Sequence, residues 1–128
     1  MSRTIALNLT MDGTCLCNDT TTLTALLTTA SVKIQRVSKN SNYTILSSDY
    51  LIGADVSSQS ITFTLPVAST VSEQIFEIVD EKGNASVNNI ILITQGSDTI
   101  VGETSYAINK NYTAIEIYSD GGTSYLIK

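Results

Sequence analysis

The chain has 128 residues, a formal net charge of −5 and neither histidine nor tryptophan. This length suits one domain with an appended arm, and the negative charge argues against binding to a nucleic-acid backbone. The lack of histidine removes the most frequent proton shuttle and metal ligand. No apolar stretch approaches the roughly 18 residues that predict a membrane-spanning helix, so we expect neither nucleic-acid binding nor membrane insertion.

The N-terminal part gives mixed signals. Residues 3–9 alternate between apolar and polar and could form a strand. Residues 23–30 stay open between two structures, because their leucines fit a helical face whereas threonine, frequent around them, is a poor helix former. Residues 32–37 are typical of a strand. A polar break follows, so we expect an anchoring arm over residues 1–38 and a β domain over residues 39–128.

The two cysteines form a Cys15-Leu16-Cys17 motif. A disulfide between residues i and i+2 would be strained, and a zinc site would need two further ligands. We expect two reduced thiols. The alternative is that cysteine pairs from three copies of the chain meet near a symmetry axis.

From residue 43 onward the chain consists of short segments in which apolar and polar residues alternate. Glycine, asparagine, aspartate or proline separates them, which is typical of short strands joined by turns. The 18 threonines favour strands, and the 16 serines and 9 asparagines favour turns. The expected strands cover residues 43–46, 49–52 with Gly53 as the end, 61–65 with Pro66 as the end, 76–78, 90–94, 115–117 and 125–127.

The alternation also predicts which side chains face inward. Phe76 and Ile78 flank Glu77, and Ile115 and Ile117 flank Glu116. Successive side chains of a strand point to opposite faces, so the apolar residues should face the core and the two glutamates should face water. We therefore expect an all-β fold, a small antiparallel β-sandwich or barrel of about seven to nine short strands.

A continuous apolar run interrupts the alternation at residues 90–94. Such a run is either buried on both faces or placed at a contact between subunits. We take Ile90, Ile91, Leu92 and Ile93 as the candidate interface between copies of the chain.

The residue types argue against catalysis, cofactors and metals. Serine and cysteine nucleophiles have no histidine to act as their base. Glu77 and Glu116 could be neighbours, as a glycosidase pair requires, but each occupies an outward polar position. Asp80, Glu81 and Asp120 lie in turns, where an oxygen-rich Ca²⁺ site is the alternative to the expected capping of backbone amides. We expect no enzyme, no cofactor and no metal site.

Tyr118 is the candidate ligand contact among the six tyrosines. Surface tyrosines form patches that stack on sugars or bind proteins. Tyr118 shares the outward side of its strand with Glu116, which favours such a role. The alternative is ordinary packing at a strand edge.

A series of short motifs carries a resemblance to a known group. They occur in a fixed order: an entry segment at 43–54, Ile-Thr-Phe-Thr-Leu-Pro at 61–66, Asp-Glu-Lys-Gly-Asn-Ala at 80–85, Asn-Asn-Ile at 88–90, Thr-Ile-Val-Gly at 99–102 and Ser-Asp-Gly at 119–121. With this order and spacing, about two thirds of the chain resembles a small β module of structural proteins from tailed phages and other large DNA viruses. Residues 122–125 depart from the group, in which a tryptophan is common at this place.

The resemblance implies a place in the virion and often a homotrimer. Because the chain is short and has no shaft of its own, we expect a capsid decoration protein, a minor capsid protein or a head-fibre component. It would be made in the host cytoplasm and would bind a major capsid protein or another virion protein through residues 1–38. The alternative is a receptor-binding tail-fibre module that recognises a host-surface glycan. A hydrolase of surface polysaccharide is a third reading.

Overall fold

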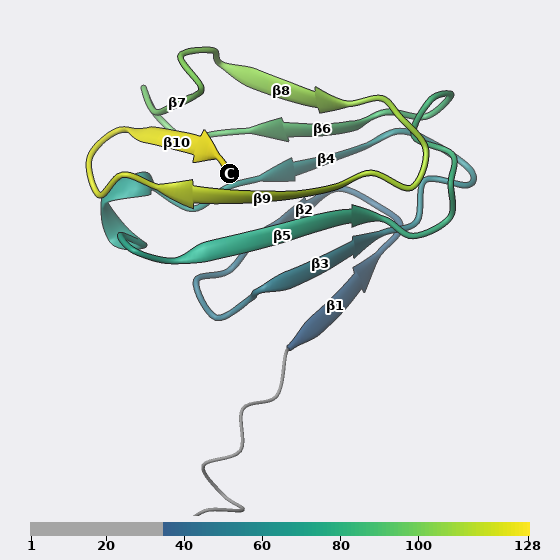
Figure 1. Ribbon diagram of the computed structural model, residues 1–128, viewed down its shortest axis with the longest axis horizontal. Coiled ribbons are helices and arrows are strands. Elements are labelled where there is room, and N and C mark those ends of the chain that lie inside the picture. The colour runs from purple at the N-terminus through teal and green to yellow at the C-terminus, as the bar shows by residue number, and fades with distance from the viewer. Residues whose placement is uncertain (1–34) are drawn as a thin grey trace, which may run out of the picture. The chain divides into compact units, whose positions relative to one another are not determined.

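The computed structural model of the protein describes residues 35–128. The predictions for residues 3–9 and 23–30, for Cys15 and Cys17 and for the arm up to residue 34 lie outside the described residues. The described part contains ten strands and one short 3₁₀ helix (Figure 1). These elements are β1 (Arg36–Lys39), β2 (Tyr43–Thr44), β3 (Leu51–Ala54), β4 (Ile61–Thr64), η1 (Ala68–Thr70), β5 (Ile75–Asp80), β6 (Ile90–Ile93), β7 (Thr99–Ile100), β8 (Ser105–Ile108), β9 (Ala114–Ser119) and β10 (Ser124–Ile127).

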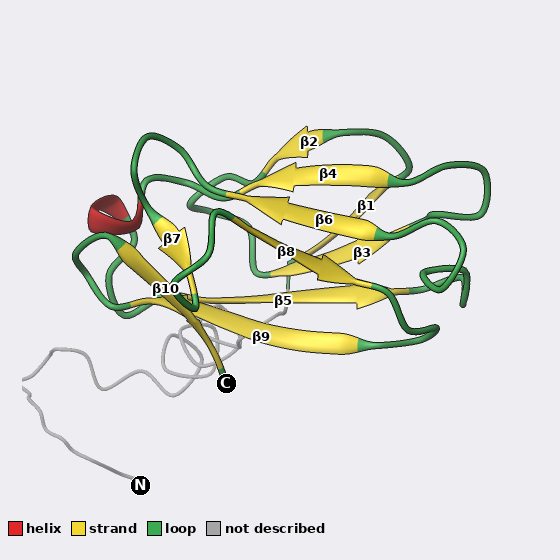
Figure 2. Cartoon of the chain, turned by 90° about the horizontal axis from the view of Figure 1, so that it is seen from above, coloured by secondary structure: helices red, strands yellow, loops and turns green. Residues whose placement is uncertain are grey.

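The strands form two sheets, which confirms the all-β prediction. Sheet A has six strands in the order β1-β3-β5-β9-β10-β7, and sheet B has four in the order β2-β4-β6-β8. Figure 2 shows them as two layers. The strand count exceeds the expected seven to nine, since β7 and β8 lie outside the segments expected to form strands.

The expected antiparallel arrangement is wrong for the first six strands. Within residues 35–128, β1, β3 and β5 pair in parallel in sheet A, and β2, β4 and β6 pair in parallel in sheet B. The reason is that the chain crosses to the other sheet after every strand, so each strand returns to its sheet in the same direction. The result is a solenoid-like stack of three coils, each with one strand in sheet A and one in sheet B. Antiparallel pairing begins only with β8, β9 and β10, and β7 again pairs in parallel, with β10.

The inner faces of the two sheets share one hydrophobic core. Phe76, Ile78 and Ile117 are fully buried, and Ile115 packs against them, as the alternation predicted. Each fully buried large apolar side chain contributes about 1.5–3 kcal/mol relative to its exposed state. The buried set therefore accounts for the position of both sheets.

Two details at the start of the sheets differ from the sequence prediction. Gly53 does not end a strand but lies buried within β3. A residue without a side chain is needed there because the Glu81 side chain fills the space above it. Residues 36–38, expected in the arm, belong to β1 and pair with β3. The predicted strand at 32–37 overlaps β1 at residues 36 and 37.

Candidate functional site

The outer face of sheet A carries Tyr118. Its neighbours across the sheet are Ile75 on β5 and Leu126 on β10, which together form an apolar row. Leu126 is 37% exposed and Tyr118 is half-buried. A shallow depression of about 320 Å³ beside the row is lined by Glu73, Ile75, Tyr118 and Lys128. The predicted contact residue thus borders a surface hollow with one charge of each sign.

The same face places Glu77 directly opposite Glu116. The Glu77 amide donates to Tyr50 O at 2.8 Å, and Glu116 O accepts from the Lys128 amide at 2.8 Å. The backbone hydrogen-bonding groups of the two glutamates therefore point away from each other. The two glutamates therefore form a non-hydrogen-bonded pair, in which Cα atoms lie about 4.5 Å apart and side chains are close. The sequence predicted their outward orientation; their pairing depends on the register of β5 and β9.

One cation compensates this pair in part. Lys128 Nζ lies 3.7 Å from Glu116 Oε1, and the Glu116 side chain is 37% exposed. Two like charges directly opposite each other on a sheet are destabilising. The Glu77 and Glu116 pair therefore lowers the stability of sheet A.

The candidate interface residues on β6 divide between two environments. Ile90 and Leu92 are fully buried in the core, whereas Ile91 and Ile93 are half-buried and lie on the outer face of sheet B, beside Thr62 and Thr64. Ile93 and Thr64 also line a depression of about 330 Å³ on that face. A contact between copies through this strand would therefore use Ile91 and Ile93.

The Asp80 carboxylate organises the loops at one end of the sheets. It is 1% exposed and accepts four backbone N–H groups: Lys82 at 3.1 Å and Gly83 at 3.0 Å on Oδ1, and Ala85 at 3.0 Å and Tyr112 at 3.1 Å on Oδ2. Burial alone would raise the pKa of Asp80, but these hydrogen bonds favour the charged form and lower the pKa overall. The predicted capping of amides by Asp80 is confirmed.

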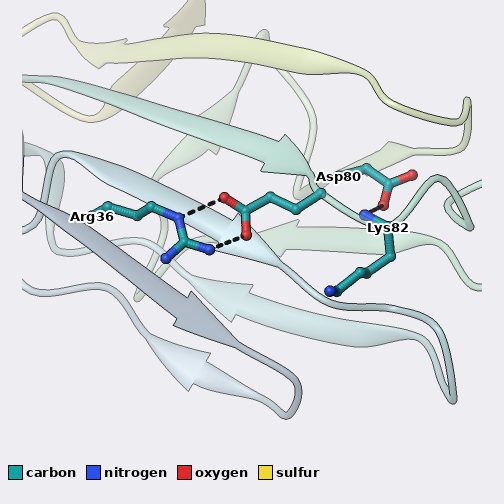
Figure 3. Close-up of polar contacts among 4 residues, drawn as sticks. Arg36, Asp80 and Lys82 are labelled. Atoms are coloured by element: carbon teal, nitrogen blue, oxygen red, sulfur yellow. Dashed lines mark hydrogen bonds and ion pairs between the residues drawn. The ribbon is translucent and has the colours of Figure 1, made fainter.

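Asp120 and Glu81 also bind protein groups. Asp120 Oδ1 accepts the amides of Gly122 at 2.8 Å and Ser124 at 3.2 Å, which confirms its capping role. Glu81 instead pairs with Arg36 (Figure 3). Among residues 35–128, no group of three or more cysteine, aspartate or glutamate residues is placed to hold a metal ion.

One exposed aromatic residue escaped the sequence reasoning. Tyr112 is 71% exposed and has a φ of 58°. It lies in the turn between β8 and β9, where the Thr113 amide donates to Lys110 O at 3.3 Å. No periodic pattern marks a turn residue, and a left-handed φ is usually a sign of glycine or asparagine rather than tyrosine. The sequence therefore held no signal for its exposure.

No helix in the part of the chain that the structure describes is long and apolar enough to cross a membrane. Comparison of the chain with protein-family models, with curated proteins and with solved structures finds no match.

Proposed function

We propose that the chain is a non-enzymatic structural protein of a virus particle, a decoration or minor capsid protein or a head-fibre component. The observation that carries the proposal is what the residues of the resemblance motifs do. Asp80 holds four amides of its turn and of the facing loop, and Asn88 and Asn89 donate to Val56 O at 2.8 Å and to Ala85 O at 2.7 Å. Such motif residues build a scaffold, which suits a structural module.

The last motif works in the same way. Ser119 Oγ donates to Ala68 O at 2.5 Å and accepts the Gly121 amide at 2.9 Å, so it ties the final hairpin to η1. These bonds join strands that are far apart in the sequence. A domain braced in this manner is suited to hold its shape while its outer faces contact neighbours.

In this proposal the outer faces of the two sheets serve different contacts. The outer face of sheet B, with Ile91 and Ile93, joins copies of the chain into a homotrimer with sandwich-like subunits. The apolar row Ile75, Tyr118 and Leu126 on sheet A meets a major capsid protein or another virion protein. Apolar side chains that are half-exposed in one chain gain free energy when a partner covers them.

The location is tested on purified particles. Virus particles that carry this sequence would be isolated by density gradient, and peptides of residues 35–128 would be quantified by mass spectrometry. We expect a fixed copy number per particle and labelling of intact particles by an antibody against the chain. Recovery of the chain only from the soluble host fraction would refute the proposal.

The self-association is tested by light scattering after size exclusion. The wild-type chain should have a mass near three copies, and Ile93→Lys should reduce it toward one copy. Val87→Lys, at a site that is 78% exposed in a loop, is the matched control and should leave the mass unchanged. A wild-type monomer would refute the trimer without affecting the test on particles.

A second candidate function is recognition of a host-surface glycan by a tail-fibre module. It is favoured by the depression beside Tyr118, in which Glu73 and Lys128 supply polar groups next to an aromatic ring. Binding on a glycan array that is lost in Tyr118→Ala would support this reading, and binding that survives the substitution would reject it.

A further inference from the structure

Each sheet of the described part has two edge strands, and β8 is the least protected of the four. The edges are β1 and β7 in sheet A and β2 and β8 in sheet B. Edge strands present unpaired backbone groups to other chains, and proteins protect them with charged residues or by keeping them very short. β1 carries Arg36 and Lys39, and β2 and β7 are two residues long. β8 has four residues, and none of them is charged or a proline.

The pairing of β8 with β6 decides where its backbone groups point. An amide of the segment that follows β4 donates to Ile93 O at 2.8 Å, so Ile93 directs its backbone toward that side of β6. The direction alternates along a strand, so Leu92 faces β8 and forms a hydrogen-bonded pair with Tyr106. Ser105 and Ala107, on either side of Tyr106, therefore direct their N–H and C=O groups away from β6.

These outward groups are accessible to a second strand. Ser105 and Ala107 are both exposed, and no backbone hydrogen bond joins either of them to a turn or loop of residues 35–128. Figure 1 shows β8 as the outermost strand of sheet B. The two side chains are small, so they leave room for the close approach of a neighbouring backbone.

An antiparallel copy of β8 satisfies all of these groups. When Tyr106 lies opposite Tyr106 of the second copy, Ser105 lies opposite Ala107, and Ala107 lies opposite Ser105. Each of these two facing pairs exchanges two backbone hydrogen bonds, which gives four in total. The arrangement is identical when it is viewed from either copy, as a two-fold symmetric interface requires.

The side chains fit the same register. Tyr106 is half-buried and packs against the core, and a cross-strand pair of tyrosines would cover the part of each ring that still meets solvent. Just outside the strand, Glu103 would lie opposite Asn109 of the second copy, and Lys110 would lie opposite Gly102. The register therefore places no like charges opposite each other, which would be destabilising.

We propose that β8 is a self-association edge, through which two copies of the chain join antiparallel by the backbones of Ser105 and Ala107. Sheet B then continues across the two-fold axis into sheet B of the second copy. The contact uses the edge of the sheet rather than its outer face, so it depends neither on the trimer nor on the virion role proposed above. It is smaller than a standard protein interface, and we expect it to be weak.

The test follows the mass of the full chain by sedimentation equilibrium from about 10 µM to about 1 mM, the range of weak dissociation constants. We expect the mass to double over this range, whichever number of copies is present at the low end. Ile93→Lys, which removes the proposed trimer contact, should double from one copy to two. Hydrogen exchange of the Ser105 and Ala107 amides should become slower as the concentration rises.

Ala107→Pro is the decisive variant. Proline removes the outward N–H group from both copies and thus two of the four hydrogen bonds, yet it is tolerated on an edge strand where this group faces solvent. The dissociation constant should rise by at least about tenfold. Ser38→Pro is the matched control, because Lys39 O accepts from the Asp55 amide and the neighbouring Ser38 therefore points its N–H away from β3. It should leave the dissociation constant within about threefold.

Two charge variants test the register without changing the backbone. Ser105→Lys combined with Ala107→Lys places lysines opposite each other across the axis and should weaken the association. Ser105→Glu combined with Ala107→Lys places opposite charges there and should associate at least as tightly as the wild type.

Four results would overturn the assignment. They are a mass that stays constant up to about 1 mM, an Ala107→Pro variant that associates as the wild type does, equal effects of the two charge variants, and a Ser38→Pro variant that alone abolishes association. Protection of the Ser105 and Ala107 amides that is the same at every concentration would also contradict it, because the edge would then already be covered within one copy.

Discussion

Arg36 and Glu81 form a two-point ion pair across the strand that separates them. Nε lies 2.8 Å from Oε2 and Nη2 lies 2.5 Å from Oε1 (Figure 3). Arg36 is on β1 and Glu81 follows β5, with β3 between them. Glu81 crosses β3 at Gly53, where an added Cβ would lie 2.2 Å from its Cδ atom. The hydrogen bond and the charge of Glu81 raise the pKa of Arg36.

The first prediction concerns this crossing. Gly53→Ala should displace the Glu81 carboxylate and separate the pair, because the methyl group needs the space that the carboxylate now fills. Hydrogen exchange of the amides that join β1 to β3 should become faster, while exchange in β9 and β10 should not change. Glu81→Gln in the otherwise wild-type chain should also make hydrogen exchange of the same amides faster.

The double variant makes this test specific. If the two changes act through one contact, Glu81→Gln should have little further effect in the Gly53→Ala background, since residues in contact are not additive. Fully additive effects on exchange would contradict the crossing.

The second prediction concerns pH and Asp80. Its pKa in the folded chain is lowered from the ordinary value of 3.8. A lowered carboxylate pKa contributes stability above the ordinary value, and this contribution disappears as the pH falls through the lower folded pKa. Asp80→Asn should cost about 2–6 kcal/mol at pH 7, because an unsatisfied buried donor costs roughly 1–3 kcal/mol and the two amides on the replaced oxygen lose their acceptor.

Denaturant unfolding at several pH values measures this contribution. The difference in unfolding free energy between wild type and Asp80→Asn should be constant above about pH 5 and should shrink below pH 4. Asp120→Asn, in the exposed turn of the last hairpin, is the control and should cost less. A difference that grows in acid would contradict the assignment.

The third prediction concerns the Glu77 and Glu116 pair. Glu77→Lys should stabilise the chain by roughly 0.2–1 kcal/mol, because it replaces a like-charge pair by an opposite-charge pair across β5 and β9. The gain should decrease at high salt, where exposed charges are screened. Glu77→Gln removes only the repulsion and should gain less. Urea unfolding at low and high salt distinguishes these cases, and a Lys variant less stable than the Gln variant would contradict the register.

The fourth prediction concerns Val101. It has a φ of 49° and is followed by Gly102 with a φ of 82°. Ile100 and Glu103 exchange two backbone hydrogen bonds around them, at 2.7 and 2.9 Å. This is a two-residue hairpin turn in which asparagine and glycine are preferred. Val101→Asn should raise the free energy of unfolding by about 1 kcal/mol, since the left-handed region is costly for a β-branched residue.

Exposure does not explain such a gain by itself. Val101 is 53% exposed and Val87 is 78% exposed, but Val87 has no positive φ. Val87→Asn is therefore the matched control and should leave the unfolding midpoint nearly unchanged. Equal effects of the two substitutions would show that polarity, rather than backbone conformation, is responsible.

The sequence predicts the strands of this fold better than their partners. Alternation around Glu77 and Glu116 reports which side of a strand meets the core, so β5 and β9 could be recognised with the correct faces. It carries no information on the direction of the neighbouring strand. The parallel order arises because the chain changes sheets between β1 and β6, and loops such as residues 55–60 have no signature for this crossing.

The missed or ambiguous residues have physical explanations of the same kind. Gly53 indicated a strand end because glycine is typical of turns. Within β3, the space of its missing side chain is filled by the Glu81 carboxylate, 28 positions later in the sequence. Residues 90–93 concealed an ordinary alternation, since Ile91 and Ile93 are apolar although they face outward. The exposure of Tyr112 follows from one backbone angle and from a loop 29 positions earlier, and neither is visible in a local pattern.

The solenoid-like stack has a consequence for the chain during its synthesis. β5 ends at Asp80, but its antiparallel partner β9 begins only at Ala114, and β6 receives β8 only from Ser105 onward. At a synthesis rate of about 5–20 residues per second, roughly 2–7 seconds pass between the synthesis of β5 and that of its partner. During that time both sheets end in unpaired strands, which readily join other chains. Nascent chains that emerge side by side on one messenger are therefore exposed to each other at the stage when their edges are open.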